Sequence, residues 1–424
     1  MKVFKFGGAS VKDAYSLKNI ASVLSLHKED SLVVVVSAMG KMTNALEQLL
    51  EDYFHKRNSK NEKLDTIKTF HKNIMDALFP ANHKVYAQVD LLYSALEKKI
   101  SLPVSEEYDY EYDQIVPYGE LISSRIVNAY LKDSGLTSKW MDAREFIKTD
   151  NSYRDAKIDW ELSGELTCQA IIPYLRGTNG DKRNIILTQG FIGTAEDDTM
   201  STLGREGSDY SAAILAYLLK AESVTIWKDV PGVLNADPKW LADAIKLDEI
   251  SYREAIELAY YGASVIHPKT IKPLENAGIP LYVKCFLDPK LSGTEISPTS
   301  VIQLPTPVFI RKQNQVLISI SPRDFSFIVE KNLSLIFARM ARYSVKANLM
   351  QNSAISFSIC VDNDKYRIPK LIADLQNEFK VKYNDELELF TIRHYTDESV
   401  KRVANGRKIL LEQKSRYTLQ LVVK

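Results

Sequence analysis

Residues 202–213 have the sequence TLGREGSDYSAA, which places two glycines, an arginine, a serine and an aspartate before a helical pattern. Gly204 and Gly207 allow positive φ and close approach of the backbone to a ligand, and the apolar spacing over 210–218 predicts a helix. The first N–H groups of a helix are unpaired and attract anions. Arg205 can hold a carboxylate through two hydrogen bonds. The stretch therefore predicts a site for an acidic ligand.

Ser208 and Asp209 admit a second interpretation of this stretch. Serine and aspartate are among the commonest helix caps, so a glycine-containing turn capped by these residues has the same sequence. The choice between a capped turn and an anion site depends on what the rest of the chain brings to it.

The opening residues, MKVFKFGGAS, contain a second candidate anion site. A short β run meets Gly7 and Gly8, whose main-chain N–H groups can face a phosphate, and Lys5 supplies a positive charge. The pattern over 13–26 then predicts a helix. This order is typical of a nucleotide-phosphate cradle, but a structural Gly-Gly turn also fits it, and the spacing is not that of a P-loop or a dinucleotide fingerprint.

Residues 31–40, SLVVVVSAMG, predict a strand buried on both faces of a parallel sheet, because the run is apolar without alternation. Small and hydroxylated residues, Ser37, Ala38, Gly40 and Thr43, follow its carboxyl end. Open α/β sheets bind ligands at the carboxyl ends of their strands. We therefore expect these residues to line the same crevice.

The composition excludes several classes of protein. The 424 residues carry a formal charge of +1, which lacks the basic footprint of a nucleic-acid-binding protein. We find no signal peptide and no apolar run long enough to span a membrane. Cys168, Cys285 and Cys360 are far apart and odd in number, as expected of reduced thiols in a cytoplasmic protein without a disulfide frame or a zinc site.

The chain is long enough for two or three domains. Residues 41–133 show helical spacing and predict a helical insertion or lid, and Pro280–Lys284 predicts the last strand of an α/β domain. We place this domain at 1–296 and a linker rich in proline, serine and threonine at 297–307. Residues 308–424 predict a ferredoxin-like order of strand, helix, two strands, helix and strand, followed by a shortened second repeat. In that repeat 397–404 predicts a helix and 417–423 predicts the last strand.

Seven segments, in order and at similar spacing, resemble aspartate kinases. They are KFGG (5–8), VSAMG (36–40), YGEL (118–121), QGFIG (189–193), TLGREGSDY (202–210), WKDVPGV (227–233) and YGASVIHP (261–268). The resemblance implies the amino-acid-kinase fold, a mostly parallel sheet between helices, followed by ACT domains. It also implies a phosphotransferase that uses ATP and Mg²⁺ to convert L-aspartate into 4-phospho-L-aspartate, the first step of lysine, threonine and methionine biosynthesis.

The resemblance implies roles for the matching residues. In the catalytic positions, Lys5 stabilises the transferring phosphoryl group and Asp209 orients Lys5 or the acceptor. The substrate-binding positions are Ser37, Thr43, Glu120, Arg205 and Ser208, with Arg205 on the α-carboxylate and Glu120 on the ammonium. The ATP-binding positions are Lys5, Gly7, Gly8, Lys228, Asp229, Leu234, Lys239 and Ser264. The carboxylate acceptor is already ionised at neutral pH, so this chemistry needs no strong base.

Several residues depart from the family pattern. Glu206 stands where the family often has glycine, and its charge is expected to weaken aspartate binding unless the side chain points outward. Lys228, Leu234, Lys239 and Ser264 also replace family residues at the nucleotide end. The positive charge absent at Ser264 can be supplied by Lys228 or Lys269.

The ACT-like region departs as well, at Ser321–Ser326, Asn348 and Ala354, and its second repeat is shortened. We therefore expect a homodimer held through this region with weak feedback inhibition. Two alternatives stay open: a kinase of the same fold with another acceptor, and an amino-acid-binding regulator with a decayed kinase domain.

Overall fold

The computed structural model describes residues 1–176, 185–263, 266–298, 304, 306–324 and 326–424. These residues form two compact units. The first unit contains the described residues of 1–233, 246–256 and 265–300, and the second contains those of 234–245, 257–264 and 301–424.

The first unit is built on an eight-stranded, mostly parallel sheet within the described residues. Across the sheet the strands are β3 (Ser138–Trp140), β4 (Ile185–Gln189), β2 (Leu32–Val36), β1 (Lys2–Phe6), β7 (Ser223–Lys228), β9 (Leu281–Cys285), β10 (Thr294–Ser297) and β8 (Glu249–Ser251). The run predicted to be buried forms β2, and all five of its residues are buried. Pro280–Lys284 corresponds to β9, but it is not the last strand as predicted, because β10 follows and pairs with it antiparallel.

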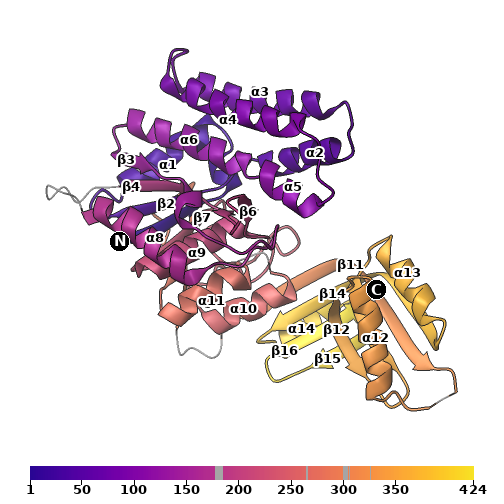
Figure 1. The fold of residues 1–424 in the computed structure, drawn as a ribbon. Helices are drawn as coiled ribbons and strands as arrows, with labels where there is room; N and C mark the ends of the chain where they lie inside the picture. Colours follow the sequence, from indigo (N-terminus) through magenta and orange to yellow (C-terminus); the bar gives the residue numbers. More distant parts are fainter. Residues whose placement is uncertain (177–184, 264–265, 299–303, 305, 325) are drawn as a thin grey trace. The chain divides into compact units, whose positions relative to one another are not determined.

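Helices flank this sheet, with α1 and α6 on one side and α8 and α9 on the other (Figure 1). The helices of this unit are α1 (Ala14–Ser25), α2 (Met42–Phe54), α3 (Lys60–Leu78), α4 (Lys84–Ser101), α5 (Tyr108–Ile115), α6 (Tyr118–Asp133), α7 (Ala143–Phe146), α8 (Trp160–Arg176), α9 (Gly207–Leu219), α11 (Pro268–Ala277) and the 3₁₀ turn Gly8–Val11. A small hairpin is formed by β5 (Ile192–Thr194) and β6 (Met200–Thr202). Helix α10 (Tyr252–Tyr261) is divided between the two units.

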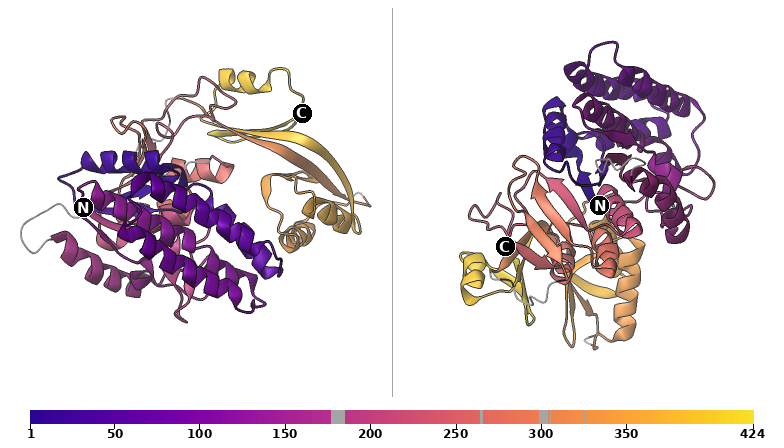
Figure 2. Two further views of the ribbon diagram at one scale, coloured as in Figure 1. Left: turned by 90° about the horizontal axis from the view of Figure 1, so that it is seen from above. Right: turned by 90° about the vertical axis from the view of Figure 1, so that its left-hand side faces the viewer.

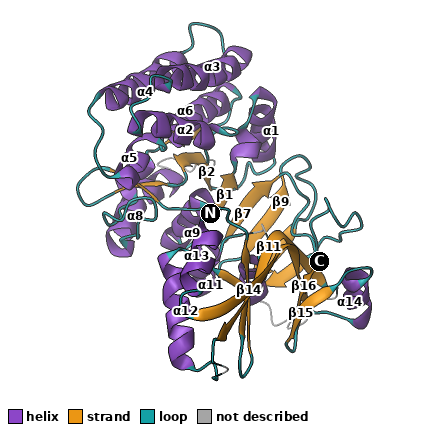
Figure 3. Ribbon diagram, turned by 90° about the vertical axis from the view of Figure 1, so that its right-hand side faces the viewer, coloured by secondary structure: helices purple, strands orange, loops and turns teal. Residues whose placement is uncertain are grey.

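The helical region predicted over 41–133 is confirmed as α2 to α6. These helices gather at one end of the first unit, away from β9 (Figure 3). Their apolar faces pack together: Leu46 and Leu49 of α2, Ile67 of α3 and Leu96 of α4 are each fully buried. This helical region also contacts the sheet, because α6 packs on β2, β3 and β4.

The second unit contains a six-stranded antiparallel sheet within the described residues. Its elements along the chain are β11 (Val308–Pro322), α12 (Glu330–Arg342), β12 (Ala347–Asn352), β13 (Phe357–Asp362), α13 (Arg367–Leu375), β14 (Phe379–Arg393), α14 (Asp397–Ala404), β15 (Ile409–Lys414) and β16 (Thr418–Val423). The predicted order of strand, helix, two strands, helix and strand is confirmed from β11 to β14. Helix α14 and β16 also lie where the shortened repeat predicted a helix and a last strand.

Strands β11 and β14 run side by side over 15 residues each and serve both halves of this sheet (Figure 2). The later part of β11 pairs with β13, whereas the later part of β14 pairs with β16. The second repeat is short because the first part of β11 supplies one of its strands. Two long strands thus make one continuous sheet from two repeats.

Candidate active site

A cavity of about 480 Å³ opens at the carboxyl ends of β1 and β2. Eight of the predicted site residues line it: Lys5, Gly8, Ser37, Thr43, Glu120, Arg205, Ser208 and Asp209. They come from β1, the turn after it, the end of β2, α2, α6, the loop before α9 and the first turn of α9. Gly8 is required at its place because a Cβ atom there would lie 2.7 Å from the carbonyl oxygen of Gly40.

The buried carboxylate of Asp209 is held between two lysines. Its Oδ1 lies 2.6 Å from Nζ of Lys5, and its Oδ2 lies 4.0 Å from Nζ of Lys228. Lys228 ends β7, which runs parallel to β1, so the sheet itself brings both lysines to the same edge. Asp209 is therefore an ion-pair partner of Lys5.

Glu120 carries an incompletely satisfied carboxyl group at the cavity wall. Its Oε1 accepts a hydrogen bond from the N–H of Ala38 at 3.0 Å, but its Oε2 has no hydrogen-bond partner among the described residues. Burial raises the pKa of Glu120 to about 8, although the N–H of Ala38 and the charge of Lys5 oppose this shift. An unpaired buried acceptor of this kind fits a cationic or proton-donating ligand group.

Arg205 offers the opposite charge. It is exposed on the loop between β6 and α9, lines the cavity, and makes no ion pair with any residue that the structure describes. Ser208 and Asp209 lie inside α9, whose N-cap is Glu206, and neither caps the helix. The capped-turn interpretation is therefore wrong, and the side chains of Ser208 and Asp209 stay available to the cavity.

Glu206 does not face the cavity with a free carboxylate. Its Oε2 accepts a hydrogen bond from the N–H of His267 at 3.0 Å, immediately before α11. The expected weakening of an acidic ligand by Glu206 is thus reduced, because its charge lies at the positive end of another helix.

The other described residues predicted to bind the nucleotide are not among those that line this cavity. Gly7 precedes the 3₁₀ turn and lies against the Lys5 ammonium, and Asp229 is exposed after β7. Leu234 and Lys239 belong to the segment 234–245 of the second unit. Ser264 lies outside the described residues. Lys269, one candidate for the charge absent at Ser264, is ion-paired with Asp155.

Four residues of the cavity wall were not predicted from the sequence: Glu47, Tyr112, Arg154 and Phe191. The hydroxyl of Tyr112 donates to Oε1 of Glu47 at 2.9 Å, and the Arg154 guanidinium lies 4.5 Å from the centre of the Tyr112 ring. These residues come from α2, α5 and a loop that are far apart along the chain. Phe191 lies within the QGFIG segment, which was the one available signal for it.

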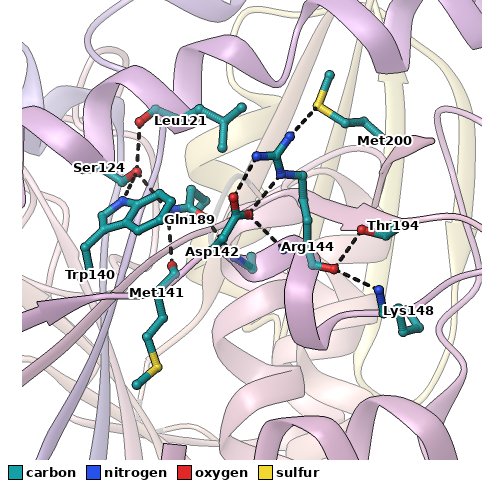
Figure 4. A network of polar contacts seen from close by, with 11 residues as sticks. Leu121, Ser124, Trp140, Met141, Asp142, Arg144, Lys148, Gln189, Thr194 and Met200 are labelled. Atoms are coloured by element: carbon teal, nitrogen blue, oxygen red, sulfur yellow. Dashed lines mark hydrogen bonds and ion pairs between the residues drawn. The ribbon is translucent and has the colours of Figure 1, made fainter. Parts of the chain in front are cut away.

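A polar network surrounds Gln189, the last residue of β4 (Figure 4). The hydroxyl of Ser124 accepts hydrogen bonds from Nε1 of Trp140 at 2.9 Å and from Nε2 of Gln189 at 2.8 Å. The Oε1 of Gln189 accepts from the N–H of Ala143 at 2.8 Å. Because these groups are largely buried and paired, they fix the strand end from which the cavity wall continues.

Within the part of the chain that is described, no group of three or more histidine, cysteine, aspartate or glutamate side chains could hold a metal ion. No helix among the same residues has the length and apolarity needed to cross a membrane.

Comparison with known proteins agrees with this geometry. Residues 1–285 match the amino acid kinase family. Lysine-sensitive aspartokinase 3 of Escherichia coli (strain K12) is 30% identical over 367 residues, which cover 85% of this chain and 78% of that protein. By contrast, the chain spans 35% of the length of a bifunctional aspartokinase/homoserine dehydrogenase from the same organism.

Solved structures show the same likeness. The structure of E. coli aspartokinase III with lysine and aspartate has a TM-score of 0.83 and 28% identity, and covers 100% of this chain and 96% of that one. The structure of E. coli aspartokinase III with aspartate and ADP has a TM-score of 0.80 and 27% identity, with the same coverage. The chain therefore belongs to the amino acid kinase family and, within it, to the aspartokinases.

Proposed function

We propose that this protein transfers the γ-phosphoryl group of ATP to the β-carboxylate of L-aspartate, which gives 4-phospho-L-aspartate. The observation that carries this proposal is the presence of two unsatisfied groups of opposite charge in one cavity. Glu120 presents a buried, unpartnered Oε2, and Arg205 presents a guanidinium without an ion-pair partner among the described residues. An α-amino acid offers an ammonium to the first and a carboxylate to the second.

Lys5 then acts on the reacting phosphoryl group. Lys5 is 9% exposed, and its ammonium forms an ion pair with Asp209. The ammonium is therefore oriented before the substrate binds. Phosphoryl transfer needs positioning and neutralisation of charge more than covalent chemistry. Asp209 serves as the group that orients Lys5, since an ionised carboxylate acceptor has no proton for a base to remove. Ser37, Thr43 and Ser208 supply the hydroxyl groups around the acceptor.

ATP is the donor in this proposal, with Gly7, Gly8 and Lys228 at its phosphates and Asp229, Leu234, Lys239 and Ser264 assigned to the nucleotide by resemblance alone. In kinase sites Mg²⁺ is held by one or two carboxylates together with substrate phosphates. The residues present fit such a metal, because Asp209 can offer a carboxylate oxygen beside Lys5 while the phosphates supply the other ligands. The bound metal would neutralise phosphate charge.

The regulatory part of the proposal concerns residues 308–424, joined through 297–307 to a catalytic domain at 1–296. We infer that this region holds a homodimer. Strand β12 is an edge of its sheet, and its sequence ANLMQN contains no charge and no proline. Such an edge invites pairing with another strand.

Hydroxylamine trapping of an acyl phosphate tests the activity directly. The protein is mixed with MgATP and L-aspartate, and formation of aspartyl hydroxamate is measured. L-Glutamate, N-acetyl-L-glutamate and uridine monophosphate serve as alternative acceptors, with ADP release as the readout for the last. Hydroxamate formation with L-aspartate alone is expected. Turnover of another acceptor, or none at all, would favour the other acceptor or the decayed regulator.

A further inference from the structure

Glu206 has a backbone conformation that residues other than glycine rarely adopt. Its φ is +54° and its ψ is 28°, in the left-handed region. Such residues persist only where the surroundings hold them, and they gather at functional sites. Glu206 lies between Arg205 and Gly207 at the start of α9. Its backbone conformation therefore sets the direction of the chain at Arg205, just before the helix.

The Glu206 side chain supplies one of the contacts that hold this conformation. Its Oε2 accepts the N–H of His267 at 3.0 Å. His267 is the N-cap of α11, and its own Nδ1 accepts the N–H of Lys269. A carboxylate is stabilised at this end of a helix by the unpaired N–H groups and by the helix dipole.

Gly204, the residue before Arg205, is also connected to the first turn of α11, through Asp155. Gly204, with φ at +78°, packs so closely on Asp155 that a Cβ atom would lie 2.4 Å from its Oδ1. Asp155 in turn forms an ion pair with Lys269 of α11. Both residues that flank Arg205 are therefore tied, directly or through Asp155, to residues 267–269.

We infer that Glu206 is a positioning residue for Arg205. By bonding to the first turn of α11, its carboxylate holds residue 206 left-handed and thereby aims the Arg205 guanidinium into the cavity. The inference deepens the proposed function, because it assigns Glu206 to the acceptor side of that site. It also explains how an acidic residue is tolerated beside a group that binds a carboxylate.

The backbone requirement gives a distinctive test with Glu206→Ala and Glu206→Gly. Alanine loses the bond to His267 and disfavours the left-handed conformation, so the KM for aspartate is expected to rise about fivefold or more. Glycine also loses the bond but adopts this conformation readily, so most of the increase is expected to be absent. The KM for ATP should change little in both. Equal KM values for aspartate in parent and alanine variants, or equal increases in both variants, would overturn the inference.

Lys220 provides a matched control. It is also left-handed, with φ at +50°, but it lies at the opposite end of α9 and outside the cavity. Lys220→Ala and Lys220→Gly are expected to leave both KM values unchanged, while their unfolding temperatures report the same backbone preference. A change in the KM for aspartate in these variants would show that α9 responds as a whole, which contradicts a specific role for Glu206.

A double-mutant cycle tests whether Glu206 acts through Arg205. Arg205→Lys keeps the charge but loses the two-pronged geometry, so it is expected to raise the KM for aspartate. Adding Glu206→Ala to that variant should then raise the KM much less than it does in the parent. Fully additive increases would mean that Glu206 affects aspartate binding by another route.

Hydrogen exchange of the folded protein separates this inference from the proposed function. The N–H of His267 should exchange more slowly in the parent than in Glu206→Ala and Glu206→Gly, whether or not aspartate is phosphorylated. If the parent forms no hydroxamate, the proposed function fails while this result still tests the bond. If the parent is active and the exchange of His267 is the same in all three proteins, the inference alone fails.

Discussion

Lys5 is the residue on which the proposed chemistry depends most. Its Nζ lies 2.6 Å from Oδ1 of Asp209, next to the glycine turn that follows β1. We expect Lys5→Ala to reduce kcat by roughly 100-fold or more, by analogy with the loss of one preorganised charge-stabilising donor. Steady-state hydroxamate assays measure this loss, and circular dichroism checks the fold. Lys2→Ala, at the other end of β1, is the control; a kcat for Lys5→Ala within a few-fold of the parent would contradict the assignment.

A second prediction for a single residue concerns Glu120, which should make aspartate binding depend on pH. Burial raises the pKa of Glu120 to about 8, so most of this carboxyl group is protonated in the free protein at pH 7. An ammonium beside it favours the ionised form, so binding should release a proton and weaken as pH falls below 8. Calorimetry at pH 7 in buffers of different ionisation enthalpy measures the proton. Release that persists unchanged in Glu120→Gln would show that another group is responsible.

A buried histidine of α3 contacts a tyrosine of α4. His71 is fully buried, its Nδ1 lies 2.8 Å from the hydroxyl of Tyr93, and burial lowers its pKa to about 4. As pH falls from 6.5 to 4, His71 takes up a proton in the unfolded chain but stays neutral in the folded protein. The free energy of unfolding should therefore decrease by on the order of 3 kcal/mol over this range. Urea unfolding at pH 6.5 and 4.5 should show a smaller decrease for His71→Phe. Equal decreases in both proteins would exclude His71 as the cause.

At the scale of the whole molecule, the open edge of the second unit predicts a dimer. Met350 on β12 and Phe337 on α12 are 40% and 42% exposed. Light scattering should find two copies of the parent in one particle, and Met350→Lys should shift the population toward monomers because it adds a charge at the edge strand. Tyr366→Lys, at an exposed position before α13, is the control. A monomeric parent at high concentration would refute the dimer.

Regulation also belongs to this scale. An effector must bind one state of the regulatory region more tightly than another. Asn348 has no negative charge to offer an effector ammonium, and its side chain already bonds to Lys312, Gln315 and Asp362. We expect weak inhibition, if any, by lysine or threonine. Titration of each amino acid into the trapping assay at saturating MgATP tests this, and strong inhibition below 1 mM would disprove it.

The sequence alone was enough to predict the class of fold, and eight of the residues that it singled out line one cavity. Local patterns carried this information: the unbroken apolar run of β2, the glycines after β1 and the turn before α9 each depend on neighbours along the chain. Lys5, Arg205 and Asp209 follow from such motifs. The sheet then brings them together, because parallel strands place their carboxyl ends at one edge.

Contacts between distant segments were decided only by the tertiary structure. Glu47, Tyr112 and Arg154 meet in the cavity wall although more than 40 residues separate each from the next, so no local pattern marks them. The strand β10 escaped prediction because its four residues are held by pairing with β8 and β9 rather than by their own propensity. The partner of Glu206 lies 61 residues away in His267. The hydrogen bond that engages the Glu206 carboxylate, on which tolerance of this charge depends, is therefore formed only by packing of the folded chain.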